Sequence, residues 1–209
     1  MNGAQAMVKC LENEGVEMVF GYPGVAICPF YDSLLDTDIK SVLIRTEQNA
    51  AHAASGLARV TGKVGVCFAT SGPGATNLVT GIATAYMDSI PMVAITGNVG
   101  TSLIGRDSFQ EVYIAGITMP ITKHNFVVRK VDELADILRD AFRIAQTGRK
   151  GPVLVDIPKD VTGATAEFTP VKPQIPVYKT ELDGQELARA AQVIGNARRP
   201  VIYSAAVWP

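Results

Sequence analysis

Two short apolar runs are each followed by a turn and then by a segment of small residues. Residues 41–44 (SVLI) precede Glu47 and an alanine-rich segment, and residues 64–69 (VGVCFA) precede the turn Ser71-Gly72-Pro73-Gly74. Short β-rich runs that alternate with longer helix-compatible segments predict strand–turn–helix units. In a parallel sheet both turns lie at the carboxyl ends of strands, where open α/β folds bind ligands. We therefore expect Glu47 and the glycine turn to face one crevice.

The same alternation continues along the first 160 residues. Strands are expected at 16–20, 42–44, 64–69, 92–96, 126–128 and 152–157. Helices are expected at 2–15, beginning at Asn2, at 29–35, at 47–62, at 78–87 and at 132–148, the last one capped by Asp132. Residues 97–120 show neither the helix periodicity nor the strand periodicity of apolar residues. A connection of this length is typical of a functional loop. These elements predict an α/β fold with a doubly wound, six-stranded, mainly parallel sheet and helices on both faces.

The composition changes after residue 160. We expect a first domain at 1–162 and a proline- and threonine-rich interdomain linker at 163–180. Residues 181–209 have one helix pattern and one strand pattern, at 200–204. A unit of this size cannot bury a core of its own. We therefore expect these residues to be the truncated start of a second domain.

Charge and cysteine content exclude several classes of protein. Of 209 residues, 47% are hydrophobic and 19% are charged, which is typical of a globular protein. A net charge of -1 favours neither nucleic acid nor an anionic membrane as a partner. There is no apolar run of membrane-spanning length and no signal-peptide pattern. Cys10, Cys28 and Cys67 have neither disulfide-frame nor zinc-site spacing, so we expect no metal ligands here and a cytoplasmic location.

The glycine turn fits neither of the two common nucleotide motifs. Asn77 stands where the dinucleotide fingerprint needs its third glycine, and no acidic residue ends the strand at 92–96. Residues 56–63 have five residues between the glycines of a P-loop, which needs four. A purely structural strand-to-helix turn remains open for the glycine motif. For Glu47, a carboxylate that stabilises a helix N-terminus remains open, and for His52 a packed, satisfied side chain.

Several motifs in one order resemble the thiamine-diphosphate enzymes. They are Tyr22-Pro23-Gly24, Glu47 followed by Gln48-Asn49-Ala50-Ala51-His52, Ser71-Gly72-Pro73-Gly74-Ala75-Thr76-Asn77, and Asp88-Ser89-Ile90-Pro91. These resemble the pyrimidine-binding domain of that family. Three more segments, 107–111 (DSFQE), 121–125 (ITKHN) and 151–160 (GPVLVDIPKD), are similar to the acetolactate synthase catalytic subunits within it. The resemblance runs from about Gly3 to Asp160.

The resemblance implies a cofactor, a reaction and roles for particular residues. It implies that Glu47 is the catalytic glutamate, which hydrogen-bonds the aminopyrimidine of thiamine diphosphate at N1′. It implies a reaction in which pyruvate loses CO2 and joins a second 2-oxo acid, in the biosynthesis of valine, leucine and isoleucine. The implied walls of the pyrimidine pocket are Tyr22, Gly24, Pro73 and Asn77. The implied substrate-channel residues are Phe109, Gln110, Lys123 and Lys159, and Arg149 matches an arginine that contacts FAD.

The family also implies components beyond this chain. Its Mg²⁺ and diphosphate ligands lie in a carboxyl-terminal domain supplied by the neighbouring subunit, so we expect a homodimer or larger assembly and an inactive isolated chain. A regulatory small subunit is a further expected partner. Four positions depart from the family pattern and leave substrate preference open: Val25, Thr46, Asn98 and Gly100. A pyruvate oxidase, a 2-oxo acid decarboxylase and a non-catalytic nucleotide-binding module remain alternatives.

Overall fold

The computed structural model describes residues 1–173 and 182–201. The chain divides into two units, Met1–Ile175 and Pro176–Pro209. The expected boundaries at 1–162, 163–180 and 181–209 remain a proposal. Residues 174–181 of the expected linker, and most of the strand expected at 200–204, lie outside the described residues.

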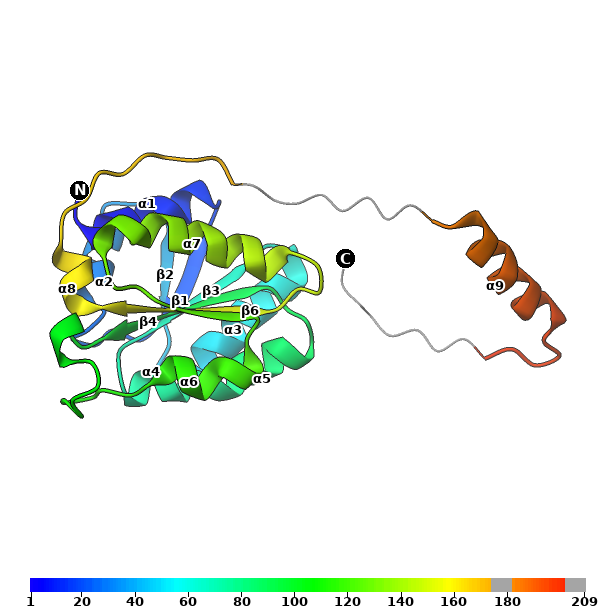
Figure 1. The fold of residues 1–209 in the computed structure, drawn as a ribbon, viewed down its shortest axis with the longest axis horizontal. Coiled ribbons are helices and arrows are strands. Elements are labelled where there is room, and N and C mark those ends of the chain that lie inside the picture. The colour runs from blue at the N-terminus through cyan, green and yellow to red at the C-terminus, as the bar shows by residue number, and fades with distance from the viewer. Residues whose placement is uncertain (174–181, 202–209) are drawn as a thin grey trace. The chain divides into compact units, whose positions relative to one another are not determined.

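The first unit is built on one six-stranded sheet (Figure 1). Its strands are β1 (Met18–Gly21), β2 (Lys40–Leu43), β3 (Gly65–Ala69), β4 (Met92–Asn98), β5 (His124–Val127) and β6 (Pro152–Pro158). The spatial order is β2-β1-β3-β4-β6-β5, and every neighbouring pair is parallel. The predicted doubly wound α/β fold is confirmed, and the sheet is entirely parallel.

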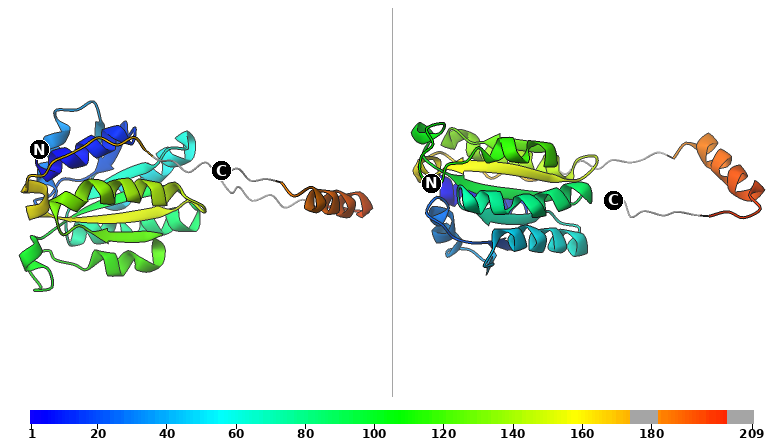
Figure 2. Two further views of the ribbon diagram at one scale, coloured as in Figure 1. Left: turned by 45° about the horizontal axis from the view of Figure 1, so that its top comes forward. Right: turned by 90° about the horizontal axis from the view of Figure 1, so that it is seen from below.

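Helices cover both faces of this sheet (Figures 1 and 2). One face carries α1 (Gly3–Asn13), α2 (Cys28–Leu34), α7 (Val131–Gln146) and α8 (Lys159–Gly163). The other carries α3 (Glu47–Thr61), α4 (Pro73–Asn77), α5 (Val79–Met87) and α6 (Ile114–Thr118). The aperiodic region also contains two short 3₁₀ turns, η1 (Thr101–Leu103) and η2 (Met119–Ile121).

The two faces bury two separate apolar clusters because side chains alternate along each strand. On β3, Val66 and Phe68 face the α1–α7 side, whereas Cys67 and Ala69 face the α3–α5 side. Phe68 stacks on Phe30 of α2 with 3.9 Å between ring centroids. The second face is lined by small side chains, which lets its helices approach the sheet closely. A Cβ on Gly65 would lie 2.1 Å from the Ala54 carbonyl oxygen of α3.

The helix ends agree with the sequence in most places. Asn2 forms a capping box with Gln5 at the start of α1, and Gly62 ends α3 in the left-handed conformation at φ 73°. The prediction that Asp132 caps α7 is wrong. Lys130 occupies the cap position without a side-chain hydrogen bond, and Asp132 lies inside the first turn, where its charge complements the helix dipole.

In the second unit the structure describes one helix, α9 (Gly184–Asn196). Asp183 caps it by accepting a hydrogen bond from the backbone N–H of Gln185 at 2.9 Å. This helix agrees with the pattern expected after residue 181. Within the described ranges, no helix is both long and apolar enough to cross a membrane.

Candidate active site at the carboxyl ends of the strands

Glu47 is a buried carboxylate at the first position of α3. It is 8% exposed. The residue before it, Thr46, occupies the cap position in an extended conformation without a side-chain cap. The Nδ2 of Asn77 donates a hydrogen bond of 2.9 Å to Glu47 Oε2. Two residues that lie 30 positions apart are therefore brought together, as the sequence predicted for the glutamate and the glycine turn.

The glycine turn lies directly against this carboxylate. Gly72 has a φ of 61°, in the left-handed region, and precedes Pro73 and Gly74 at the start of α4. A Cβ on Gly74 would lie 3.1 Å from Glu47 Oε1 and 2.8 Å from the Thr70 methyl carbon. The absent side chain at Gly74 thus leaves room beside the carboxylate oxygen that Asn77 does not contact.

Thr70, which directly follows β3, also packs against Gly74. We call Glu47, Gly74 and Thr70 together the cradle. The Thr70 hydroxyl is buried, and it has no hydrogen-bond partner within the described residues. Gly24, in the turn after β1, lies so close that a Cβ there would be 2.5 Å from Thr70 Cβ. A buried hydroxyl without a partner is costly, which makes Thr70 a candidate ligand contact. Thr70 was not among the site residues predicted from the sequence. Its place between a strand and the glycine turn was the available signal.

The strand order explains why these turns meet. The chain passes from β1 to β2 at the edge of the sheet, then returns past β1 to β3. The connections after β1 and β3 leave in opposite directions, which opens a crevice between their carboxyl ends. Gly24 follows β1 and Thr70 follows β3, so their contact lies at this switch point. Tyr22, also in the turn after β1, is 42% exposed.

The loop after β4 reaches the same glycine turn. The carbonyl oxygen of Gln110 would lie 2.6 Å from a Cβ on Gly72. Gln110 has a φ of 59°, and the adjacent Phe109 side chain is 85% exposed. The structure therefore places both expected channel residues of this loop at the carboxyl edge of the sheet.

Lys159 also lies at this edge, at the first position of α8 directly after β6. It borders an open hollow of about 790 Å³. The other lining residues come from the turn after β1 and from α2: Pro23, Val25, Cys28, Pro29, Tyr31, Asp32 and Leu35. Burial raises the pKa of the Tyr31 hydroxyl well above its ordinary value. The lining of this hollow is mostly apolar and holds one cation, Lys159, and one carboxylate, Asp32.

Two other expected site residues lie at the opposite ends of the strands, the amino ends. Lys123 precedes β5, and its ammonium donates to the carbonyls of Ile144 and Thr147 at the end of α7, the second at 2.5 Å. The seven residues of β6 separate the amino ends of the strands from Lys159, a span of about 20 Å. We expected Lys123 in the substrate channel. The structure instead uses it to satisfy the last carbonyls of α7, so we do not assign it to this site.

Arg149 is also outside the crevice, in the connection between α7 and β6. Its Nε donates to Ser89 Oγ at 2.8 Å, and its guanidinium carbon lies 5.9 Å from the centre of the Tyr86 ring. A further nitrogen donates to the Met87 carbonyl oxygen at 3.3 Å. The contacts hold the guanidinium at the end of α5.

A buried acid connects the neighbouring strands β4 and β6. Asp156 of β6 accepts hydrogen bonds from Thr96 Oγ1 at 2.6 Å and from Asn98 Nδ2 at 2.5 Å, both on β4. Burial raises the pKa of the Asp156 carboxyl to about 7, although both hydrogen bonds act to lower it. The sequence analysis did not single out Asn98 as a partner of this acid.

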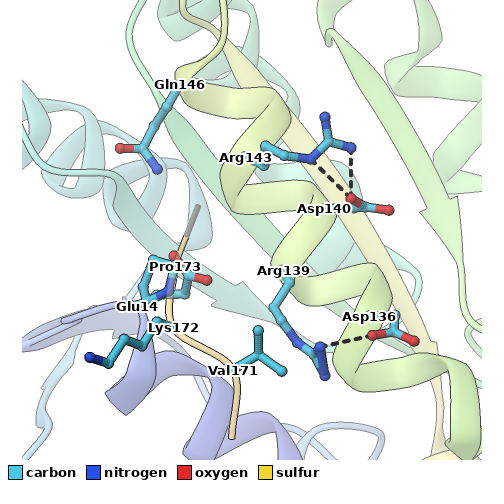
Figure 3. A pocket seen from close by; sticks show the side chains of 9 residues that line it. All are labelled: Glu14, Asp136, Arg139, Asp140, Arg143, Gln146, Val171, Lys172 and Pro173. Carbon is cyan, nitrogen blue, oxygen red and sulfur yellow. Dashed lines mark hydrogen bonds and ion pairs between the residues drawn. The ribbon is translucent and has the colours of Figure 1, made fainter. Parts of the chain in front are cut away.

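A charged hollow of about 420 Å³ lies elsewhere, between α1, α7 and the segment 171–173 (Figure 3). Arg139 pairs with Asp136 at 2.9 Å, and Arg143 pairs with Asp140 at 2.7 Å. Burial raises the pKa of Glu14 here to about 7, which the Arg139 charge partly offsets. Because its arginines are paired and none of the expected site residues line it, this hollow is not the candidate active site.

Comparison with known proteins decides the family. Residues 1–117 match the model of the thiamine pyrophosphate enzyme, N-terminal TPP binding domain. The chain belongs to the thiamine pyrophosphate enzyme family. Thiamine pyrophosphate and thiamine diphosphate are the same cofactor.

Three relatives of this chain are named for one activity. The probable acetolactate synthase large subunit of Methanocaldococcus jannaschii is 53% identical over 98% of this chain and 36% of its own length. The acetolactate synthase of Mycobacterium bovis is 56% identical over 97% of the chain and 34% of its own length. The acetolactate synthase large subunit of Corynebacterium glutamicum is 54% identical over 97% and 33%. The chain therefore spans about a third of the length of these relatives.

The crevice suits the pyrimidine end of the family's cofactor. It has a buried carboxylate with one oxygen that Asn77 does not contact, and a buried hydroxyl that has no partner among the described residues. An aminopyrimidine has both donors and acceptors to match them. The part of the chain that the structure describes has no group of three or more His, Cys, Asp and Glu side chains that could hold a metal ion.

Proposed function

We propose that this chain provides the pyrimidine-binding domain of a thiamine-diphosphate-dependent acetolactate synthase. The reaction joins pyruvate to a second 2-oxo acid with loss of CO2, at the entry to branched-chain amino-acid biosynthesis. The observation that carries the proposal is the buried Glu47 carboxylate, held by Asn77 beside the glycine turn. The names of the relatives support this reaction over others of the family.

Glu47 controls protonation of the cofactor in this proposal. Its free oxygen forms a hydrogen bond to N1′ of the aminopyrimidine, and Asn77 fixes the orientation of the carboxylate through the other oxygen. The low exposure of Glu47 strengthens that bond, because water does not compete for it. When bound, thiamine diphosphate supplies the nucleophilic carbon that adds to the 2-oxo acid.

The walls of the crevice position the ring. Gly24 packs against Thr70, whose hydroxyl is available to the ring. Pro73 begins α4 in the glycine turn, and Tyr22 lies in the turn next to Gly24. Any side chain at Gly74 would fill the space beside Glu47. These residues orient the cofactor and exclude water, whereas the bond-making chemistry belongs to the cofactor itself.

Substrate approaches from the loop and the α8 side in this proposal. Gln110 lies against the glycine turn with the exposed Phe109 next to it in the chain, and Lys159 provides a positive charge at the end of β6. A lysine at this edge attracts the carboxylate of a 2-oxo acid. Lys123 has no part in the proposed channel, because it binds the end of α7.

The remaining components extend the proposal to the assembled protein. Mg²⁺ and the diphosphate are held by residues outside those that the structure describes, in a homodimer or larger assembly that completes the site. Arg149 would contact FAD. A regulatory small subunit would be a further partner, a proposal that the name 'large subunit' of several relatives supports. The location that we propose is the cytoplasm.

A product assay tests the function. A protein with the full length of the relatives, supplied with thiamine diphosphate, Mg²⁺, FAD and pyruvate, should release CO2 and form 2-acetolactate. Acetaldehyde as the product would indicate a decarboxylase, and oxygen consumption without acetolactate would indicate an oxidase. Binding of a purine nucleotide in place of thiamine diphosphate would support the nucleotide-binding module instead.

A further inference from the structure

The loop that carries Phe109 and Gln110 is folded around one carboxylate, that of Glu111. This carboxylate accepts hydrogen bonds from the backbone N–H of Gly105, from the N–H of Ser108 at 3.0 Å and from the Ser108 hydroxyl at 3.1 Å. The N–H of Arg106 is a fourth, longer donor at 3.3 Å. The backbone hydrogen bonds from Gly105 and Ser108 hold the pKa of Glu111 below its ordinary value. A charged acceptor thus ties four donors of one turn together.

The backbone of this turn needs such an anchor. Gly105 has a φ of 81°, which glycine adopts easily, but Asp107 and Gln110 also lie in the left-handed region, at 50° and 59°. For a residue with a Cβ this conformation costs on the order of 1 kcal/mol, so it persists only where the surroundings impose it. The hydrogen bonds to Glu111 span the segment that contains Asp107 and end next to Gln110.

A second carboxylate holds the beginning of the same loop. Asp160 of α8 accepts hydrogen bonds from the Thr101 backbone N–H at 3.0 Å and from the Thr101 hydroxyl at 2.5 Å. Asp160 directly follows Lys159, so the loop start and the lysine belong to one local structure. Only the Glu111 anchor, however, lies within the turn that presents Phe109.

The backbone of this loop contacts the glycine turn of the candidate active site. The Gln110 carbonyl packs against Gly72, with no room for a Cβ between them, and Gly74 of the same glycine turn packs against Glu47. A shift of the loop therefore changes where Phe109 and Gln110 lie, whereas Glu47 is held separately by its hydrogen bond from Asn77. The Glu111 side chain itself contacts neither Glu47 nor the cradle in any interaction of the described residues.

We propose that Glu111 is a positioning residue, which fixes the loop 105–110 against the glycine turn and so sets where Phe109 and Gln110 meet the substrate. This inference rests on the proposed function for its role in substrate binding, but the anchoring itself is a property of this chain alone. Glu111 does not transfer a proton and does not touch the cofactor.

Limited proteolysis of the 209-residue chain tests the anchor. Chymotrypsin should cut Glu111→Ala after Phe109 on the order of tenfold faster than the unsubstituted chain, because the local opening that cleavage needs becomes easier. The internal control is the bond after Leu35, a side chain 82% exposed against 85% for Phe109. Its cleavage should not change. Glu111→Gln keeps one acceptor oxygen, so its rate of cleavage after Phe109 should lie between those of the unsubstituted chain and Glu111→Ala.

Two outcomes of this experiment overturn the proposal. Equal cleavage after Phe109 in Glu111→Ala and the unsubstituted chain means that the carboxylate does not hold the loop. A parallel rise after Leu35 means that the substitution loosens the whole domain. Glu133→Gln, in the first turn of α7, is the matched control for loss of one surface charge, and it should leave both cleavage rates unchanged.

Kinetics of the full-length enzyme test the consequence for substrate. Glu111→Ala should raise the KM for pyruvate several-fold more than it lowers kcat, while hydrogen–deuterium exchange at C2 of the bound cofactor stays at the unsubstituted rate. An unchanged KM, or slowed C2 exchange, contradicts the positioning role. If the unsubstituted enzyme forms no acetolactate, the proposed function fails, and the proteolysis still decides whether Glu111 anchors the loop.

Discussion

At the scale of single residues, the site depends on a carboxylate that has one occupied and one available oxygen. Asn77 donates a hydrogen bond to Oε2 of Glu47, whereas Oε1 lies beside Gly74, which has no side chain. An amide at this position would keep the hydrogen bond from Asn77 but lose the charge.

Glu47→Gln is therefore expected to preserve the fold and to slow cofactor activation. In the full-length enzyme, hydrogen–deuterium exchange at cofactor C2 should fall by about two orders of magnitude or more, the usual range for loss of a proton-transfer partner. NMR of quenched samples measures this exchange directly. Glu12→Gln, on the surface of α1, is the control and should exchange normally. Unchanged C2 exchange together with full carboligase activity would remove Glu47 from its assigned role.

Thr70→Val tests the buried hydroxyl beside Glu47. The substitution replaces the unpartnered Oγ1 with a methyl group of similar size. In the chain without cofactor the free energy of unfolding should rise by about 1 kcal/mol, because a buried polar group without a partner is removed. Urea unfolding measures this change, and Thr70→Ser is the control that keeps the hydroxyl. A clear loss of stability in the valine variant would show that the hydroxyl has a partner.

At the scale of elements, two helical glycines on the α3–α5 face differ in what surrounds them. A Cβ on Gly81 of α5 would lie 2.4 Å from the Cβ of Ala51 in α3. A Cβ on Gly56 of α3 would have no atom within 4 Å. The packing of α5 on α3 therefore requires glycine at position 81 but not at position 56.

This contrast predicts opposite effects for the same substitution. Gly81→Ala should lower the free energy of unfolding by about 1–3 kcal/mol, because the two helices must move apart. Gly56→Ala should raise it by about 0.5–1 kcal/mol, because alanine is the better helix former and nothing obstructs it. Denaturant titration of both variants gives the comparison. Destabilisation by Gly56→Ala, or tolerance of Gly81→Ala, would contradict the packing of α3 on α5.

The sequence predicted elements better than it predicted contacts. Periodicity located all six strands, and turn residues such as Gly62 marked helix ends, because these depend on local backbone chemistry. The pairing of Glu47 with the glycine turn followed from strand ends in a parallel sheet. Thr70 and Glu111 were missed because their importance lies in burial and in loop hydrogen bonds, which have no period. The position of Lys123 before the amino end of β5 was not predicted, because a motif gives neighbours in sequence and not the end of the strand at which they lie.

At the scale of the whole molecule, one buried acid, Asp156, and one partly buried acid, Glu14, make stability depend on pH. Burial raises the pKa of Asp156 and of Glu14 to about 7, above the ordinary values of 3.8 and 4.5 that apply in the unfolded chain. The folded protein therefore binds more protons than the unfolded chain between about pH 4 and 7. Stability from these groups is fully present below that window and is lost as the pH rises through 7.

The free energy of unfolding should accordingly fall between pH 5 and pH 8. Asp156→Asn should reduce this dependence, because the group that titrates on β6 is removed while a side chain that can hydrogen-bond to Thr96 remains. Urea unfolding at several pH values measures the slope, and Asp183→Asn in the second unit is the control. The same slope in Asp156→Asn and the unsubstituted chain would show that Asp156 is charged throughout this range.

The last prediction concerns what the 209-residue chain does alone. The first unit has a complete sheet with two buried clusters, so it should fold and present the pyrimidine crevice. The described residues offer no acidic cluster for Mg²⁺, and a diphosphate without its metal and its ligands is strongly hydrated. Contacts to a pyrimidine ring cannot offset the loss of that hydration. Isothermal titration with thiamine diphosphate and Mg²⁺ should therefore give no tight binding, and pyruvate should give no acetolactate. Tight binding or turnover by this chain alone would place the diphosphate site within it, and would contradict the proposal that other residues complete the active site.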